Sequence, residues 1–180
     1  GPTGPTPPSG PAALSKPAAD LKNVFGSFWI DRTEFALSVD VIREVVDEPQ
    51  VYSAIPMSPP HIRGIFSLRA EVIPIIDMRI LLGYPDRAEA ALGKVAIIEN
   101  GDHCIGLLFD DTGGIIHGAG EKRVNFRPNA EGVKDVVVEG VLKLDDGRRM
   151  VQLLDPFELL RIERLPRVAR DEIDGQGRKH

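Results

Sequence analysis

Short apolar runs separated by polar turns recur along the middle of the chain, most densely between Pro59 and Gly83. Two β-prone runs in this stretch, Gly64–Leu68 and Val72–Ile76, flank a mostly charged tripeptide that begins with Arg69. This arrangement predicts two paired strands with Arg69 at the turn. Asp77 follows the second strand directly, so its carboxylate can cap a short helix that ends at the last glycine of the stretch.

A later part of the chain repeats this hairpin-and-helix pattern. Gly140–Leu144 has the spacing of Gly64–Leu68, and Leu153–Leu160 matches Ile75–Leu82, with an aspartate at the same place in each. The second copy is slightly longer, and the excess falls in its turn, where insertions cost little. The pattern has two explanations, a structural duplication that yields two similar β subdomains or a chance match in a β-rich chain.

Further β-prone segments fill the rest of the central chain. Five strand candidates are bounded by polar or turn-forming residues: Val24–Ile30, Phe35–Val39, Val51–Ile55, Lys94–Glu99 and His103–Phe109. Val41–Val46 fits either a strand or a single helical turn capped by Asp40. Gly113 and Gly114 suggest a bend, and residues 120–133 a loop. About ten short strands with two short helices predict barrels or sandwiches, not an alternating βα fold.

The second predicted helix has the clearer start signal. Asp155 occupies the capping position, and Pro156 follows at the first helical position, where its missing N–H costs nothing. We expect Phe157, Leu159 and Leu160 to face the protein interior.

Composition separates the two ends of the chain from its folded part. Residues 1–21 are rich in proline and glycine and hold almost no large apolar side chain, so they are expected to form a disordered tail. Residues 164–180 are expected to form a charged flexible tail. The folded domain is therefore expected to span residues 22–163 of the 180-residue chain.

Charge and cysteine content narrow the class of protein. The net charge is −5 and no long block of Lys or Arg occurs, which argues against a surface for nucleic acid or anionic membranes. No apolar run approaches the roughly 20 residues that span a bilayer, and no signal-peptide pattern is present. The single cysteine, Cys104, excludes an internal disulfide and fits a reducing cytoplasm. The partners are therefore expected to be proteins.

No set of residues has the spacing of a catalytic or metal site. None of the four histidines has a second His or Cys at ligand spacing. Cys104 lies in a predicted strand, where a buried inert thiol is favoured over a nucleophile. The glycines between positions 113 and 120 lack the lysine and the helix of a phosphate loop. We therefore expect no enzyme activity, no metal and no cofactor.

Together these segments resemble the CheW-like domain. The run Ile62–Arg79 is similar to the signature segment of that family, with its Gly-x-x-x-Leu-Arg and Val-x-Pro-x-x-Asp-x-Arg patterns. Four other segments fall where the family would place them, and the resemblance covers residues 22–162: Asp40–Val45, Ile55–Pro60, Gly106–Asp110 and Met150–Asp155. Two positions depart from the family, Ser67 where asparagine is common and Ala70 where glycine is usual. Alanine tolerates positive φ poorly, so the tip that places Arg69 either has a different conformation or carries about 1 kcal/mol of strain.

The resemblance implies a mainly β fold in which two five-stranded SH3-like β-barrel subdomains pack together with short helices. It also implies a non-enzymatic adaptor, monomeric in isolation, that couples the cytoplasmic tip of a chemoreceptor to a CheA-type histidine kinase. Such an adaptor is cytoplasmic, does not insert into the membrane and is recruited to membrane-associated receptor arrays. The alternatives are a ligand-sensing or regulatory CheW-like module of a non-motility pathway, an enzyme on the same fold, or a fragment of a larger signalling protein.

Five residues are candidates for partner binding. Arg69 is either a solvated turn charge or, given the resemblance, an anchor for a partner. Glu44 either marks the solvent face of an apolar strand or supplies the polar part of an interface. Gly64 is either structural or, as in similar proteins, close to the receptor contact. Ile42 and Ile65, with Gly64, are expected to border a groove between the two β units in which a receptor helix docks.

Overall fold

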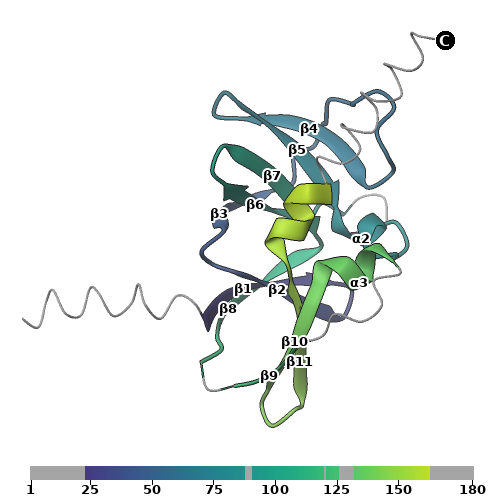
Figure 1. The fold of residues 1–180 in the computed structure, drawn as a ribbon. Coiled ribbons are helices and arrows are strands. Elements are labelled where there is room, and N and C mark those ends of the chain that lie inside the picture. The colour runs from purple at the N-terminus through teal and green to yellow at the C-terminus, as the bar shows by residue number, and fades with distance from the viewer. Residues whose placement is uncertain (1–22, 88–90, 120, 126–131, 163–180) are drawn as a thin grey trace, which may run out of the picture.

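The computed structural model describes residues 23–87, 91–119, 121–125 and 132–162, which fold into two β-sheets with short helices (Figure 1). In Figure 1 one sheet occupies the upper half of the molecule and the other the lower half. The mainly β class predicted from the strand pattern is therefore confirmed. The two expected tails, residues 1–21 and 164–180, lie outside the described residues.

The upper sheet has five strands in the order β3-β6-β7-β5-β4. The strand bounds are β3 (Ile42–Asp47), β4 (Ile62–Leu68), β5 (Glu71–Asp77), β6 (Lys94–Asn100) and β7 (His103–Phe109). The segment after Asp40 therefore forms a strand and not a helical turn. Side chains alternate between the two faces, so Ile73 and Ile75 are buried while Val72 lies on the opposite face and is exposed.

The lower sheet has six strands in the order β8-β1-β2-β11-β10-β9. The strand bounds are β1 (Val24–Ile30), β2 (Thr33–Ser38), β8 (Asp111–His117), β9 (Lys122–Asn125), β10 (Val138–Leu144) and β11 (Arg149–Leu154). This is one strand more than the five expected for each subdomain, because part of the predicted loop pairs with β10 as β9.

The two sheets share one pattern of strand pairing, as a structural duplication would produce, although the equivalent hairpins follow one another in opposite order along the chain. In the upper sheet, β6 and β7 form an antiparallel hairpin. Next to β7 lies β5, which pairs with it in parallel, and next to β5 lies β4, which pairs with it antiparallel. In the lower sheet, β1–β2, β11 and β10 repeat this arrangement. The strands β3 and β8 flank β6 and β1 at equivalent positions. The register also shifts at the same place in both copies, next to Gly64 and Gly140.

Aspartate caps start the helix of each copy. The carboxylate of Asp77 accepts hydrogen bonds from two backbone N–H groups at 3.0 and 3.4 Å, and α2 (Met78–Leu81) follows it. Asp155 accepts two equivalent hydrogen bonds at 3.0 and 3.3 Å where the helical segment 156–162 begins. Both predicted caps are confirmed. A further short helix, α3 (Val133–Val137), precedes β10 and was not predicted.

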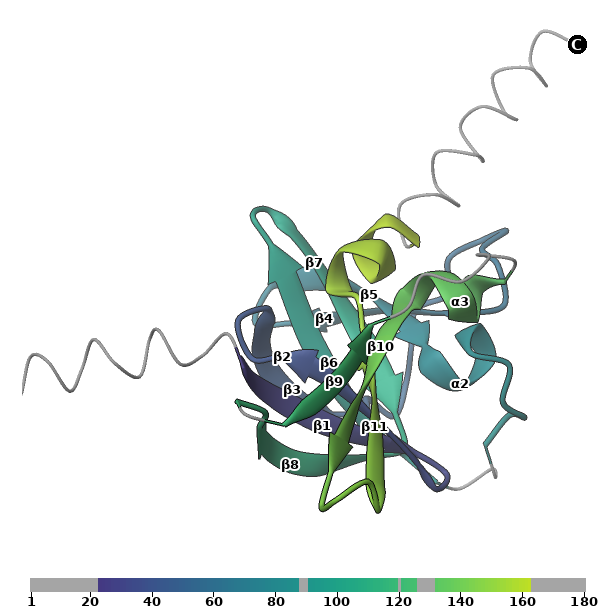
Figure 2. The same cartoon turned by 60° about the horizontal axis from the view of Figure 1, so that its bottom comes forward.

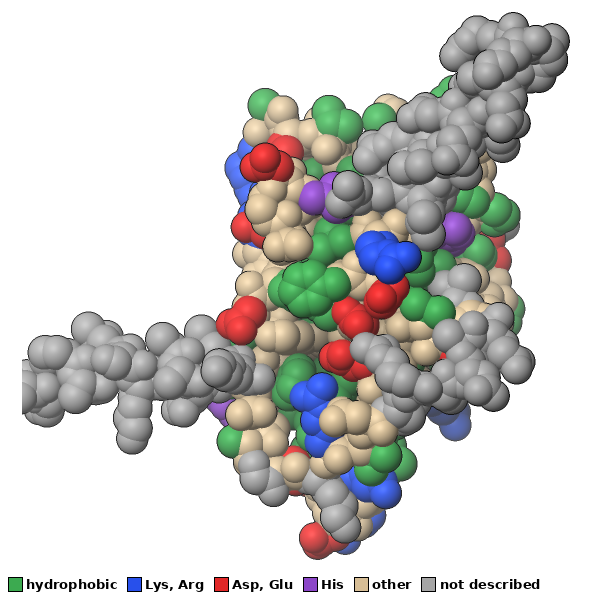
Figure 3. Space-filling model, in the orientation of Figure 1, with side chains coloured by type: hydrophobic (Ala, Val, Ile, Leu, Met, Phe, Trp, Pro, Cys, Tyr) green, Lys and Arg blue, Asp and Glu red, His purple; other side chains and the backbone are tan. Residues whose placement is uncertain are grey.

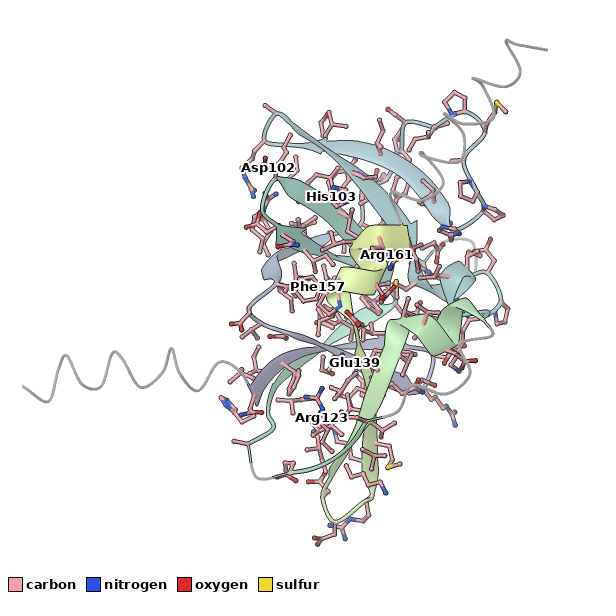
Figure 4. The ribbon with its side chains drawn as sticks, in the orientation of Figure 1. Asp102, His103, Arg123, Glu139, Phe157 and Arg161 are labelled. Carbon is pink, nitrogen blue, oxygen red and sulfur yellow. The ribbon has the colours of Figure 1, made fainter. Side chains whose placement is uncertain are left out.

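The segment 156–162 presents a different face to the core from the one expected. Leu159 and Leu160 are buried as predicted, but Phe157 is 55% exposed and lies on the outside of the helix (Figure 4). The prediction for Phe157 is wrong because helical periodicity aligns Leu159 and Leu160 with Pro156, and the residue after Pro156 turns away from that face.

One apolar core joins the two sheets. Phe28 of β1 stacks on Phe109 of β7 with 4.7 Å between ring centroids, and Phe35 of β2 contacts the same ring. The helices α2 and α3 and the segment 156–162 lie near one another at one side of the sheets (Figure 2). The buried side chains of Met78 and Leu159 belong to this core. Each β unit also has an apolar cluster of its own, which includes Ile73 and Val95 in the upper unit and Phe25 and Leu142 in the lower unit.

Two local predictions are wrong. Val51–Ile55 does not form a strand, because only Ser53 makes a bridge, with Ile65 of β4. Gly113 and Gly114 do not form a bend but lie within β8, where Gly113 is the extra residue of a β-bulge opposite β1. Gly114 has a φ of 121°, which the strand can adopt only because this residue has no Cβ.

Candidate functional site

An apolar groove lies where the two sheets meet, between β3 of the upper sheet and β1 and β8 of the lower sheet. Its volume is about 300 Å³. Val45 and Ile115 line the groove with 41% and 61% of their surfaces exposed, and Phe28 and Ile42 also line it. Apolar side chains exposed together in a concave surface are typical of a binding site.

Close approach of the two sheets shapes this groove. Gly26 of β1 faces β3, and a Cβ at this position would lie 2.8 Å from Cδ1 of Ile42. Any larger residue would collide with the side chain of Ile42, and both positions line the groove. The depth of the groove therefore depends on the glycine in β1.

The sequence pattern does not predict the β8 side of the groove. Thr112 and Ile115 of this strand line the groove, but the glycine pair between them was interpreted as a bend. The only signal that could have revealed the strand is the β-branched pair Ile115-Ile116 directly after the glycines.

The tip of the β4–β5 hairpin carries Arg69. Arg69 and Ala70 have φ angles of 50° and 70°, as in the two-residue turn with left-handed residues that suits the twist of a hairpin. The guanidinium of Arg69 forms an ion pair with the carboxylate of Glu44 on β3. Two of the five predicted partner-binding residues are therefore in direct contact.

Arg43, the residue before Glu44, forms further ion pairs next to this contact. Arg43 of β3 lies 3.0 Å from Glu71 and 3.4 Å from Glu99. Burial raises the pKa of the neighbouring Cys104 thiol. The neutral thiol is therefore favoured, as expected for a cysteine without a nucleophilic role.

Gly64 and Ile65 lie away from the groove. Gly64 is buried, has a φ of 147°, and a Cβ there would lie 2.7 Å from the carbonyl oxygen of Ser53. Ile65 exchanges two backbone hydrogen bonds of 2.9 Å with Ser53. The expectation that these residues border the groove is wrong, because neither of them lines it and β4 is instead covered by Ser53.

Ile65 instead belongs to the outward side of the hairpin. The register pairs Ile65 with Pro74 and Ser67 with Val72, and the residues between them point to the core. Val72 is 61% exposed. These four residues form a second, mostly apolar surface, which we call the hairpin face.

Arg79 holds the two sheets together. Its side chain is almost fully buried and donates hydrogen bonds to Asp31 at 2.8 Å, to Asp110 at 2.7 Å and to the carbonyl oxygen of Pro85 at 2.7 Å. Asp31 lies in the turn between β1 and β2, whereas Arg79 belongs to α2. The hydrogen bond to Asp31 raises the pKa of Arg79, so the guanidinium stays charged. The sequence around Arg79 does not predict which carboxylates it contacts.

The described residues offer binding surfaces and no metal centre. Among them, no three His, Cys, Asp or Glu side chains are grouped so that they could hold a metal ion. No helix in the same part of the chain is long and apolar enough to cross a membrane. Acidic, basic and apolar side chains are interspersed on the face shown in Figure 3.

Comparisons with known proteins agree with this architecture. The chemotaxis protein CheW of Bacillus subtilis is 27% identical over 74% of this chain and 83% of its own length. The chemotaxis protein CheW of Helicobacter pylori is 27% identical over 76% of this chain and 81% of its own length. The crystal structure of the scaffolding protein TtCheW from Thermoanaerobacter tengcongensis covers 74% of this chain and 88% of that chain, with a TM-score of 0.63 and 24% identity.

The family match spans nearly all of the described residues. Residues 25–164 match the CheW-like domain, and this range contains both sheets, the groove and the hairpin face. The chain therefore belongs to the CheW-like domain family.

Proposed function

We propose that this chain is a cytoplasmic adaptor that couples a chemoreceptor to a CheA-type histidine kinase in a chemosensory array. The observation that carries the proposal is an apolar groove at the junction of two sheets in a member of the CheW-like family. The relatives from Bacillus subtilis and Helicobacter pylori are chemotaxis proteins, which supports a role in chemosensory signalling. An adaptor needs separate surfaces for its two partners, and the groove and the hairpin face are separate.

The groove is the proposed site for the receptor. A receptor tip is helical, and a helix presents apolar side chains at i, i+3, i+4 and i+7 along one face. Val45 and Ile115 stand on different sheets and are both partly exposed, so they can contact such a face from two sides. The rigid junction loses little conformational entropy when the helix docks.

The hairpin face is the proposed site for the kinase. Ile65, Val72 and Pro74 supply apolar area on strands fixed by the ladder, and Arg69 adds a charge at the tip. An apolar centre with an arginine at its margin is a common composition of protein interfaces. In this arrangement the receptor lies at the junction of the two sheets and the kinase on the β4–β5 hairpin, so both can bind together.

Reconstitution tests the proposed function. The purified chain is added to membranes that contain the receptor and to the kinase encoded by the same genome, and the rate of kinase autophosphorylation is measured. We expect a rate well above that of the kinase and receptor without the chain, and co-sedimentation of the kinase with the membranes. The same rate and no co-sedimentation in the presence of the chain would contradict the proposal.

A further inference from the structure

A cationic pocket with an aromatic wall lies on the lower sheet, away from both proposed surfaces. It has a volume of about 340 Å³ and includes Trp29, Arg32, Arg148, Arg149 and Met150. It lies at the ends of two hairpins, β1–β2 and β10–β11. None of its residues lines the groove or belongs to the hairpin face.

Strand topology brings the arginines of the two hairpins together. β2 and β11 are parallel neighbours, with Glu34 paired to Val151. Parallel strands start at the same end of a sheet, so the residues that precede them lie side by side. Arg32 immediately precedes β2, and Arg148 immediately precedes β11. Both side chains therefore enter the same pocket from adjacent turns.

Only one arginine of the pocket is neutralised. Arg149 holds the buried carboxylate of Glu34 with two hydrogen bonds, of 2.8 and 2.7 Å. Arg32 and Arg148 are exposed, and neither forms an ion pair with an acidic side chain in the described part of the chain. The nearby Asp31 is engaged by Arg79 on the other side of its turn. The guanidinium groups of Arg32 and Arg148 therefore remain free to bind an anionic ligand, although the chain as a whole has a net charge of −5.

The aromatic wall is fixed in place by β8. A Cβ on Gly113 would lie 2.9 Å from Nε1 of Trp29, so the indole packs against a strand position where only glycine fits. Met150, half of whose surface is exposed, lies at the same pocket. The pocket therefore combines apolar area with two free cations.

We propose that this pocket binds an acidic segment of a partner protein, with carboxylates on Arg32 and Arg148 and an apolar side chain against Trp29 and Met150. The pair of Glu34 with Arg149 shows that a carboxylate is held by an arginine fork in this pocket. A bare phosphate would use the cations but leave the indole and the thioether without a partner. An acidic peptide with apolar residues uses both, and tryptophan, methionine and arginine are the residues enriched at protein interfaces.

Trp29 provides a direct readout because it is the only tryptophan of the chain. The probe is a capped hexapeptide that alternates glutamate and leucine, titrated into the full chain while indole fluorescence is followed. Arg32→Gln and Arg148→Gln should each weaken binding by about tenfold, since each removes a charge-assisted hydrogen bond. Arg161→Gln is the matched control, because Arg161 is an exposed arginine on the segment 156–162 (Figure 4), and it should leave the affinity unchanged.

Two comparison ligands make the result decisive. The same peptide with glutamine in place of glutamate should not shift the emission of Trp29, and high salt should weaken binding of the acidic peptide. Inorganic phosphate at the same concentration should bind more weakly than the peptide. Equal binding of the glutamine peptide, binding that is insensitive to both arginine variants, or phosphate binding as tight as that of the peptide would each overturn the proposal.

Discussion

Arg69 and Glu44 form an ion pair that joins the tip of the β4–β5 hairpin to β3, the strand at the opposite edge of the same sheet. Arg43 and Glu71 make a second contact of 3.0 Å between the same two elements. The five-stranded sheet is therefore curled so far that its edges are bridged by charged side chains. In the free protein, Arg69 is held in position before any partner arrives.

Replacing Arg69 with alanine should leave the fold intact and weaken partner binding. Its ion pair is largely exposed, so the loss in free energy of unfolding should stay below about 1 kcal/mol. Association with the kinase should weaken by about tenfold if Arg69 anchors an interface. Urea denaturation and calorimetric titration with the purified kinase and a receptor-tip peptide measure the two effects.

Glu44→Gln separates the two roles of Arg69. This variant removes the internal ion pair but keeps the arginine, so it should weaken association less than Arg69→Ala does. Equal binding by the Arg69→Ala variant and the parent, at equal stability, would show that Arg69 is only a solvated charge that closes the sheet.

Ala70→Gly should stabilise the protein. Ala70 has a φ of 70°, a conformation that costs an alanine about 1 kcal/mol and a glycine almost nothing. After the greater flexibility of glycine in the unfolded chain is included, a gain of about 0.5 kcal/mol remains. Ala54→Gly, at an exposed position without positive φ, is the control and should be neutral or destabilising. The midpoint of urea unfolding decides, and a lower midpoint for Ala70→Gly contradicts the strain argument.

The local features of the fold could be predicted from sequence where one short signal dictates them. Asp77 and Asp155 each follow an apolar strand directly, and an aspartate in that position has few uses other than capping. The duplication could be recognised because both copies keep this order. Gly113 and Gly114 were predicted wrongly. A glycine pair in a bulged strand and a glycine pair in a bend have the same sequence, and only the partner strand distinguishes them.

The site was predicted less completely because it depends on contacts between distant parts of the chain. Ile42 lies on the groove as predicted, but Gly64 and Ile65 do not, since the distant residue Ser53 pairs with Ile65 and no local pattern predicts that bridge. Nothing local reveals that Arg79 reaches Asp31. Contacts of this kind follow from topology and not from the pattern of one segment.

Arg79→Met should destabilise the protein because it leaves two carboxylates near each other without their shared cation. Arg79 is buried and bonds both Asp31 and Asp110. Asp31 is 51% exposed and Arg87 stays 3.7 Å from Asp110, so the loss should be about 1 to 2 kcal/mol, below the cost of leaving a fully buried charge unpaired. Arg79→Lys keeps the charge but not the planar fork, so it should lose less stability. Urea denaturation measures both variants, and an unchanged midpoint for Arg79→Met would show that Arg79 does not hold the sheets together.

A bulky side chain that blocks the groove can be introduced at Thr112 but not at Gly64. A side chain at Gly64 would collide with the backbone of Ser53 and would disturb the fold before it reached any partner. Thr112 is exposed and lines the groove. Thr112→Trp should fill the groove and weaken binding of a receptor-tip helix by at least about tenfold, because the bulky indole takes the space of the apolar anchors.

The control for this variant is Thr112→Val, which has nearly the shape of threonine and should bind the receptor helix as the parent does. Both variants should bind the kinase normally, since the hairpin face is separate from the groove. Chemical-shift mapping with the receptor-tip peptide gives an independent check, with the largest changes expected at Ile42, Val45 and Ile115. If Thr112→Trp binds the receptor helix as tightly as Thr112→Val, the helix does not occupy the groove, and shifts confined to the hairpin face would move the receptor site there.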